Sequence, residues 1–102
     1  DDFSNRDMRR QVSINAYPNP FNPTTDISYQ MPDARNVSLK IYDTSGRLVV
    51  TLADGLQEAG THSVTFDGSA LASGIYLAKL ELSSSGSGTT PTTAIQKLVL
   101  MK

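Results

Sequence analysis

The sequence predicts an all-β protein, an immunoglobulin-like antiparallel β-sandwich of about seven strands. Two observations carry this prediction. Short segments in which apolar and polar side chains alternate recur along the chain, and turns rich in Gly, Pro and Asp separate them. No segment of useful length repeats its apolar residues with the period of a helix. A small closed barrel is the competing architecture for the same pattern.

The first two strands are expected at Val12–Tyr17 and Thr25–Met31, because each alternates strictly and stops at a proline. Val37–Asp43 and Leu48–Leu52 should form a hairpin whose turn contains Gly46, a residue free to adopt positive φ. The remaining strands are expected around His62–Phe66, at Ile75–Leu82 and at Ala94–Lys102.

The segments between these strands are also assigned from composition. Asp54-Gly55 and Ala59-Gly60 predict a polar bend, and Ser69–Ala72 a short connector of one helical turn. Ser83–Thr93 is almost wholly Ser, Gly and Thr, which predicts a mobile loop. With 102 residues there is room for one domain, which we expect over residues 12–102. The charged residues 1–11 read as a tail or linker from an upstream protein.

The segment Tyr17–Pro23, Tyr-Pro-Asn-Pro-Phe-Asn-Pro, is the most distinctive part of the chain. Three prolines in seven residues exclude a helix and a central strand, because each fixes φ and removes an N–H donor. Phe21 is the large apolar side chain within it. We therefore expect a rigid elbow that ends the first strand and buries Phe21 under the sandwich.

Composition argues against several classes of function. The net charge is −1 and basic residues are scattered, so no basic stripe exists for a nucleic acid. Without cysteine the chain has neither disulfides nor thiolate metal sites. No apolar run approaches the roughly 20 residues that cross a bilayer, so direct membrane insertion is not expected.

A search for catalytic groups finds none that converge. The single histidine, His62, lies on the apolar face of a strand, and no nucleophile motif accompanies it. Asp43, Asp54 and Asp67 stand at turns, where aspartate is ordinary, and no calcium-loop pattern is present. We expect no enzyme activity, no metal and no cofactor.

Two other features allow both a structural and a functional interpretation. Gly74 and Tyr76 are expected to supply a bend and a core anchor with a hydroxyl partner. The closing strand places Leu98 and Leu100 on one face, and Val99 and Met101 on the other. The second face, between Lys97 and Lys102, is either a handle for a partner or an edge protected by lysines.

The motifs together resemble a known family. Tyr17-Pro-Asn-Pro-Phe-Asn-Pro-Thr-Thr, Val37-Ser-Leu-Lys-Ile-Tyr-Asp, Ser73-Gly-Ile-Tyr and Lys97-Leu-Val-Leu-Met-Lys, in this order, are similar to the C-terminal sorting domain, type A, of type IX secretion cargo proteins of Gram-negative bacteria. Phe66, Ala78 and the Ser83–Thr93 loop depart from the family pattern.

The resemblance implies a non-catalytic domain that directs an upstream cargo across the outer membrane to the cell surface. It passes through the periplasm, and its implied partners are the type IX machinery, a sortase-like protease and the cargo domain in the same chain. It implies a secretion signal at Lys97, Leu98, Val99, Leu100, Met101 and Lys102. It also implies a structural family motif at Pro18, Asn19, Pro20, Phe21, Gly74 and Tyr76. The alternative is a retained accessory module, carbohydrate-binding or spacer, of a secreted hydrolase, for which stacking tyrosines would be needed.

Overall fold

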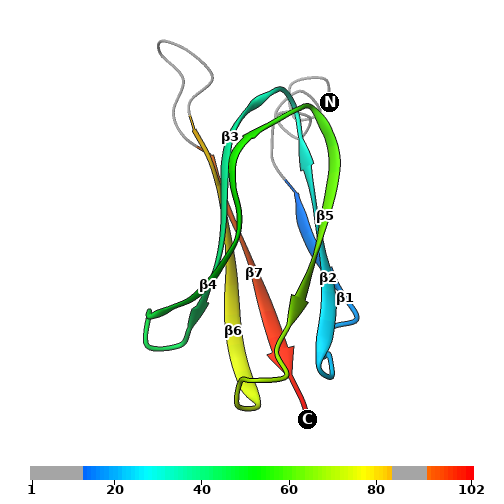
Figure 1. Ribbon diagram of the computed structural model, residues 1–102, viewed down its shortest axis with the longest axis vertical. Coiled ribbons are helices and arrows are strands. Elements are labelled where there is room, and N and C mark those ends of the chain that lie inside the picture. The colour runs from blue at the N-terminus through cyan, green and yellow to red at the C-terminus, as the bar shows by residue number, and fades with distance from the viewer. Residues whose placement is uncertain (1–12, 84–91) are drawn as a thin grey trace, which may run out of the picture.

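The computed structural model describes residues 13–83 and 92–102. Their strands form two antiparallel sheets packed face to face (Figure 1). One sheet has the order β1-β2-β5 and the other β4-β3-β6-β7. This architecture confirms the predicted immunoglobulin-like sandwich. The strands are β1 (Ile14–Tyr17), β2 (Thr24–Met31), β3 (Arg35–Asp43), β4 (Leu48–Gln57), β5 (Gly60–Asp67), β6 (Gly74–Leu82) and β7 (Thr92–Leu100).

The core lies between the two sheets and follows the period-2 pattern of the sequence. In β6, Tyr76, Ala78, Leu80 and Leu82 are all buried, whereas the intervening residues reach the surface. The same alternation buries one face of β2 and of β3. Fifteen hydrophobic residues of the described chain form this single core, which is the layered arrangement that a two-sheet domain requires.

Tyr76 closes the turn that enters β6. Its hydroxyl donates to the carbonyl of Ala72 at 2.7 Å, four residues upstream, while its ring is 8% exposed. This arrangement matches the tyrosine corner of immunoglobulin-like sandwiches. Gly74, where we expected a bend before the strand, is the first residue of β6.

Three predictions about the segments that connect the strands were wrong. β4 runs through Asp54 and Gly55 to Gln57, so the predicted polar bend there is strand, and the turn is confined to the residues just before Gly60. The pairing of β4 with β3 has two register irregularities, which break the period-2 pattern of β4. The full length of β4 could therefore not be predicted from alternation alone. The Ser69–Ala72 connector is a turn without helix, closed by Leu71 N–H to Gly68 carbonyl at 2.9 Å.

The third error concerns β7, which begins at Thr92 within the predicted loop and ends at Leu100, two residues before Lys102. Residues 84–91 of that predicted loop, and the predicted tail 1–11, fall outside the described residues.

The predicted hairpin between β3 and β4 is present, and Asp43 organises its turn. One carboxylate oxygen of Asp43 accepts the N–H of Ser45 at 3.0 Å, the hydroxyl of Ser45 at 2.6 Å and the N–H of Arg47 at 2.9 Å. These hydrogen bonds, the Ser45 hydroxyl first, lower the pKa of Asp43 below its usual value. Gly46 adopts φ of 90°, a conformation that other residues rarely take.

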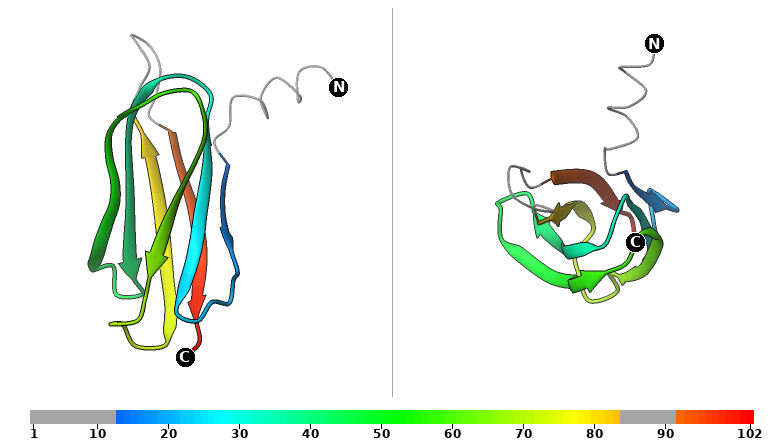
Figure 2. Two further views of the ribbon diagram at one scale, coloured as in Figure 1. Left: turned by 45° about the vertical axis from the view of Figure 1, so that its right-hand side comes forward. Right: turned by 90° about the horizontal axis from the view of Figure 1, so that it is seen from above.

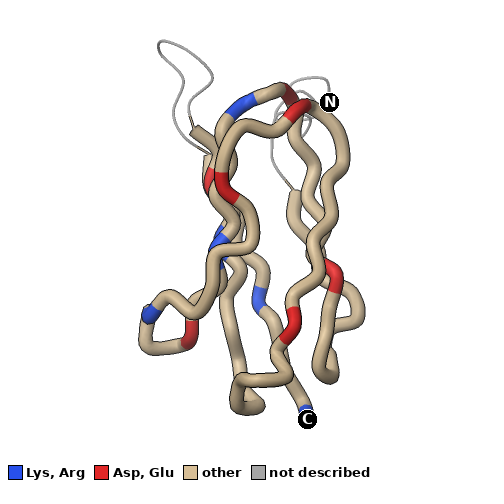
Figure 3. Tube along the Cα trace, viewed as in Figure 1, with Lys and Arg blue, Asp and Glu red and all other residues tan. Residues whose placement is uncertain are grey.

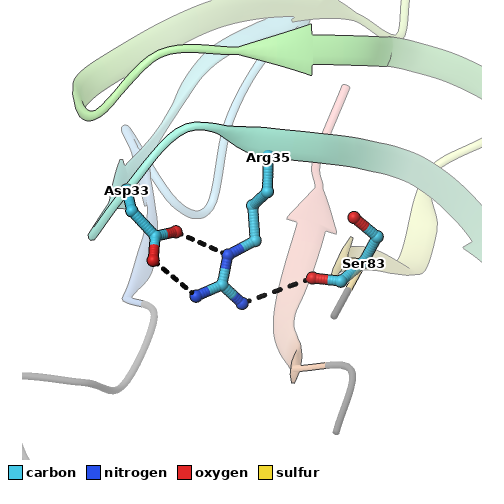
Figure 4. Close-up of polar contacts among 3 residues, drawn as sticks. All are labelled: Asp33, Arg35 and Ser83. Atoms are coloured by element: carbon cyan, nitrogen blue, oxygen red, sulfur yellow. Dashed lines mark hydrogen bonds and ion pairs between the residues drawn. The ribbon is translucent and has the colours of Figure 1, made fainter. Parts of the chain in front are cut away.

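At the opposite end of the sandwich, Arg35 ties the β2–β3 crossover to the end of β6 (Figure 4). Its guanidinium donates two hydrogen bonds to the Asp33 carboxylate, 2.6 and 3.1 Å long, and a third to the Ser83 carbonyl at 3.3 Å. Ser83 in turn donates its N–H to the Asn36 carbonyl at 3.0 Å. Ser83, the residue that follows β6, is thereby anchored to β3.

The two lateral sides of the sandwich differ. On one side β1 lies beside β7, where the two sheets meet (Figure 2). On the other side β4 and β5 stand apart and contact each other little. An open apolar hollow of about 340 Å³ lies there, lined by Val49, Val50, Leu52, Phe66, Asp67, Ala70 and Leu71.

Candidate functional site: the elbow and strand β7

The structure brings together the two segments that the sequence singled out, the elbow Tyr17–Pro23 and the segment Lys97–Lys102. The side-chain amide of Asn19 donates to the Lys97 carbonyl at 2.7 Å and accepts the Val99 N–H at 3.0 Å. Phe21 then donates its N–H to the Val99 carbonyl and accepts the Met101 N–H, both at 2.9 Å. Four consecutive outward groups on the edge of β7 are therefore paired with the elbow.

The elbow acts here as a short substitute strand. Phe21 forms a parallel bridge to Leu100, and the Asn19 side chain takes the place of a peptide group one step earlier. An asparagine amide suits this place because it carries a donor and an acceptor, as a peptide unit does. Since prolines flank Asn19, the backbone there has fewer N–H groups, and the side chain supplies the missing pairing. The elbow thus covers part of an edge strand that would otherwise be open.

Phe21 fixes the elbow from the inside. Its side chain is 2% exposed, and its ring lies 5.7 Å from that of Phe66, tilted by 55°. Such tilted aromatic pairs add to the free energy gained from burial. The predicted burial of Phe21 is therefore observed, and Phe66 provides the facing ring.

Gly68 and Thr25 complete the elbow's surroundings, and neither was singled out from the sequence. Gly68 donates its N–H to the Pro23 carbonyl at 2.8 Å, and a Cβ at this position would lie 3.0 Å from Leu100 Cδ2. The buried Thr25 hydroxyl donates to the Pro18 carbonyl at 2.7 Å. Both contacts join residues that converge only in the folded chain. The Asp67-Gly68 pair after a strand signals a turn in the sequence, but not this close approach.

The segment Lys97–Lys102 is divided between core and surface. Leu98 and Leu100 are buried, Lys97 is exposed and Met101 is 57% exposed. The ammonium of Lys102 donates to the Ser69 carbonyl at 2.7 Å, so this lysine holds the β5–β6 connector. The positive charge of Lys102 also helps to lower the pKa of Asp67, after the larger effect of the hydrogen bonds from Ser69.

The contacts of His62 and the spacing of the acidic side chains within residues 13–83 and 92–102 bear on the search for a catalytic or metal site. The His62 ring stacks on Tyr29, with centroids 5.5 Å apart, and one ring nitrogen lies 2.7 Å from the Glu58 carbonyl. Across this part of the chain, His, Asp and Glu nowhere form a group of three that could hold a metal ion. In the hollow between β4 and β5, the carboxylate of Asp67 accepts the N–H of Ser69.

The charged positions are dispersed over the described chain, and Figure 3 shows basic and acidic positions interspersed rather than gathered in one basic stripe. Nor do these residues include a helix long and apolar enough to cross a membrane. The tyrosines do not form a row either, since Tyr29 and Tyr76 are buried and Tyr17 is 81% exposed on β1.

Comparison with known proteins identifies the fold and the family. Residues 15–99 match the model of the secretion system C-terminal sorting domain. Among solved structures, the chain is similar to dimeric latent PorU from Porphyromonas gingivalis, with a TM-score of 0.68 and 22% sequence identity. This similarity covers 88% of the chain but 9% of the PorU chain, and it concerns the fold alone. The search of curated proteins gave no match. Because the family model spans most of the chain, the protein belongs to the family of secretion system C-terminal sorting domains.

Proposed function

We propose that residues 12–102 are the sorting domain of a longer cargo protein, which they direct through the periplasm and across the outer membrane to the cell surface by the type IX system. The family match over residues 15–99 is the observation that carries this proposal. The domain itself acts by being recognised and is not an enzyme. The type IX machinery, a sortase-like protease and the upstream cargo are its proposed partners.

Recognition is proposed to use the side chains of the segment Lys97–Lys102 rather than its backbone. The elbow already pairs the outward backbone groups from Lys97 to Met101, so a partner cannot add a strand along that stretch. The exposed side chains of Lys97 and Met101 remain accessible. Leu98 and Leu100 serve the signal indirectly, by anchoring the strand in the core.

The proposal is tested by fusing Asp1–Lys102 to a secreted reporter in a host with a working type IX system. We expect the reporter in the medium or on the cell surface, whereas a reporter that accumulates in the periplasm would refute the function. Lys97→Ala should lower export without lowering the melting temperature. Arg47→Ala is the matched control, because the Arg47 side chain is 79% exposed in the β3–β4 turn, away from β7.

A carbohydrate-binding role has less support, because it needs aromatic rings side by side. Two of the four tyrosines are buried in the core, and the most exposed, Tyr17, stands on β1 in the other sheet from Tyr42 on β3. Affinity electrophoresis on common polysaccharides tests this alternative directly. Retardation that Tyr17→Ala abolishes would favour it.

A further inference from the structure

Large apolar side chains are exposed on the outward face of β6 and β7. Ile75 is 44% exposed and Ile95 is 59% exposed, and Met101 follows directly after the same strand. An antiparallel sheet with one solvated face ordinarily alternates apolar and polar residues cleanly. Contiguous exposed apolar residues of this kind mark interaction sites in soluble proteins.

The register makes these residues neighbours. Ile75 is paired with Val99, Leu77 with Lys97, and Lys79 with Ile95. Directly paired residues of an antiparallel sheet lie on the same face, with Cβ atoms about 5 Å apart. We call this surface the outer β6–β7 patch, which consists of Ile75, Leu77, Ile95, Lys97, Val99 and Met101.

The charges in and beside the patch are mainly positive. Lys97 belongs to it, Lys79 adjoins it, and Lys40 of β3 is paired with Lys79 on the same face. One carboxylate, that of Glu81, lies 3.7 Å from the Lys79 ammonium. Figure 3 shows basic positions on neighbouring strands of this sheet. With three lysines against one glutamate, this surface is complementary to a partner that carries carboxylates.

From this geometry we infer that the outer β6–β7 patch docks a protein partner whose contacting surface is apolar and carries acidic side chains. The inference rests on the proposed sorting function and specifies the partner of the same strand. The elbow satisfies the β7 backbone from Lys97 to Met101, so docking there must use the face of the sheet.

The charges of the outer β6–β7 patch favour this protein partner over a second copy of the chain and over a membrane surface. A second copy of the chain, docked by two-fold symmetry, would bring the lysines of one patch against those of the other, which is unfavourable. A membrane surface would meet a sheet face on which Lys97 and Lys79 lie among the isoleucines and leucine. Insertion of that face would press ammonium groups into hydrocarbon, at a high cost.

The inference is tested with point variants in the reporter fusion described above. Ile95→Asp and Lys97→Glu should each reduce export at least about tenfold, because each places negative charge against an acidic surface. Lys97→Arg should retain export. The matched controls are Leu56→Asp and Arg47→Glu, since Leu56 is 72% exposed on β4 and Arg47 lies in the β3–β4 turn. Circular dichroism and melting temperature confirm that each variant folds.

A carbodiimide cross-link identifies the chemistry of the partner, because this reagent joins a lysine amine to a nearby carboxylate. In exporting cells we expect Lys97 linked to an Asp or Glu of another protein, as read by mass spectrometry. Lys97→Arg should lose this adduct while export continues.

Four outcomes would overturn the inference. Normal export of both Ile95→Asp and Lys97→Glu would do so while leaving the sorting function intact. An adduct between two copies of the chain would assign the patch to self-association. Binding of the purified domain to phosphatidylglycerol vesicles through Lys97, without a protein adduct, would assign it to membranes. A wild-type fusion that stays in the periplasm would refute the sorting function and the inference with it.

Discussion

The N–H of Val99 donates to the side-chain oxygen of Asn19 at 3.0 Å, across 80 residues of sequence. The same amide donates to the Lys97 carbonyl, so one side chain replaces a peptide unit at the edge of the four-stranded sheet. This relationship links the proline-rich elbow to the strand that we propose the secretion machinery recognises. It also makes the stability of β7 depend on the elbow.

Asn19→Asp should destabilise the domain by about 1–3 kcal/mol, because a carboxylate cannot donate and would face the Lys97 carbonyl. Urea unfolding followed by far-UV circular dichroism measures this free energy. Asn22→Asp is the matched control, since Asn22 also precedes a proline in the elbow but is exposed. Equal losses in the two variants would refute the role given to the Asn19 amide.

Phe21→Ala should cost about 3–5 kcal/mol in the free energy of unfolding, since it empties a buried site beside Phe66. Tyr17→Ala changes an aromatic residue of the same elbow that is 81% exposed, and it should stay within about 0.5 kcal/mol of wild type. A Phe21→Ala variant as stable as Tyr17→Ala would show that the elbow does not anchor in the core.

Gly68→Ala should destabilise by about 1–3 kcal/mol, because the added Cβ would lie 3.0 Å from Leu100 Cδ2. A double-mutant cycle with Leu100→Val tests the cause. The shorter valine gives the alanine room, so the combined loss should be smaller than the sum of the two single losses. Strict additivity would place the cost of Gly68→Ala elsewhere.

Acid should destabilise the domain through its turn carboxylates. Hydrogen bonds from Arg35, from the Ser45 hydroxyl and from the Ser69 N–H, respectively, lower the pKa values of Asp33, Asp43 and Asp67. An unfolded aspartate has a pKa of about 3.9, so around this pH the folded state binds fewer protons than the unfolded state. The stabilisation is therefore complete above the unfolded pKa and is lost as the pH falls through the lower folded pKa values.

The corresponding measurement is urea unfolding of wild type and Asp43→Asn from neutral pH downwards. The stability gap between them should be largest at neutral pH and should close in acid, where the wild-type carboxyl is also neutral. A gap that is independent of pH would mean that the charge of Asp43 does not contribute.

The strands were predictable from the sequence wherever the period of two was unbroken. Tyr76, Ala78, Leu80 and Leu82 are buried together as their spacing requires. In β4 the irregular register against β3 shifts the pattern, and the pair Asp54-Gly55 has the composition of a turn although it lies within the strand, with Gly55 at φ of 124°. Local rules do not distinguish a bulged strand from a bend when the residues are Asp and Gly.

The candidate site was predictable only as two separate segments. The prolines predicted a rigid elbow, and the alternation of the closing residues predicted a strand with an exposed face. Their contact was not predictable, since neither the Asn19 amide nor the Gly68 approach to Leu100 leaves a local signature. Pairings between residues about 80 positions apart are set by the whole topology.

The hydrogen bonds between the elbow and β7 also determine when the domain can finish folding. During synthesis the elbow leaves the ribosome first, and its partners on β7 follow only after almost the entire domain has been made. Such distant contacts form late, because the chain between them must be ordered first. A protein truncated before Lys97 therefore lacks the groups that hold both Asn19 and Phe21 in place. Loss of sorting in such a truncation would reflect an unclosed domain as much as a missing signal, so only substitutions on the exposed face separate the two.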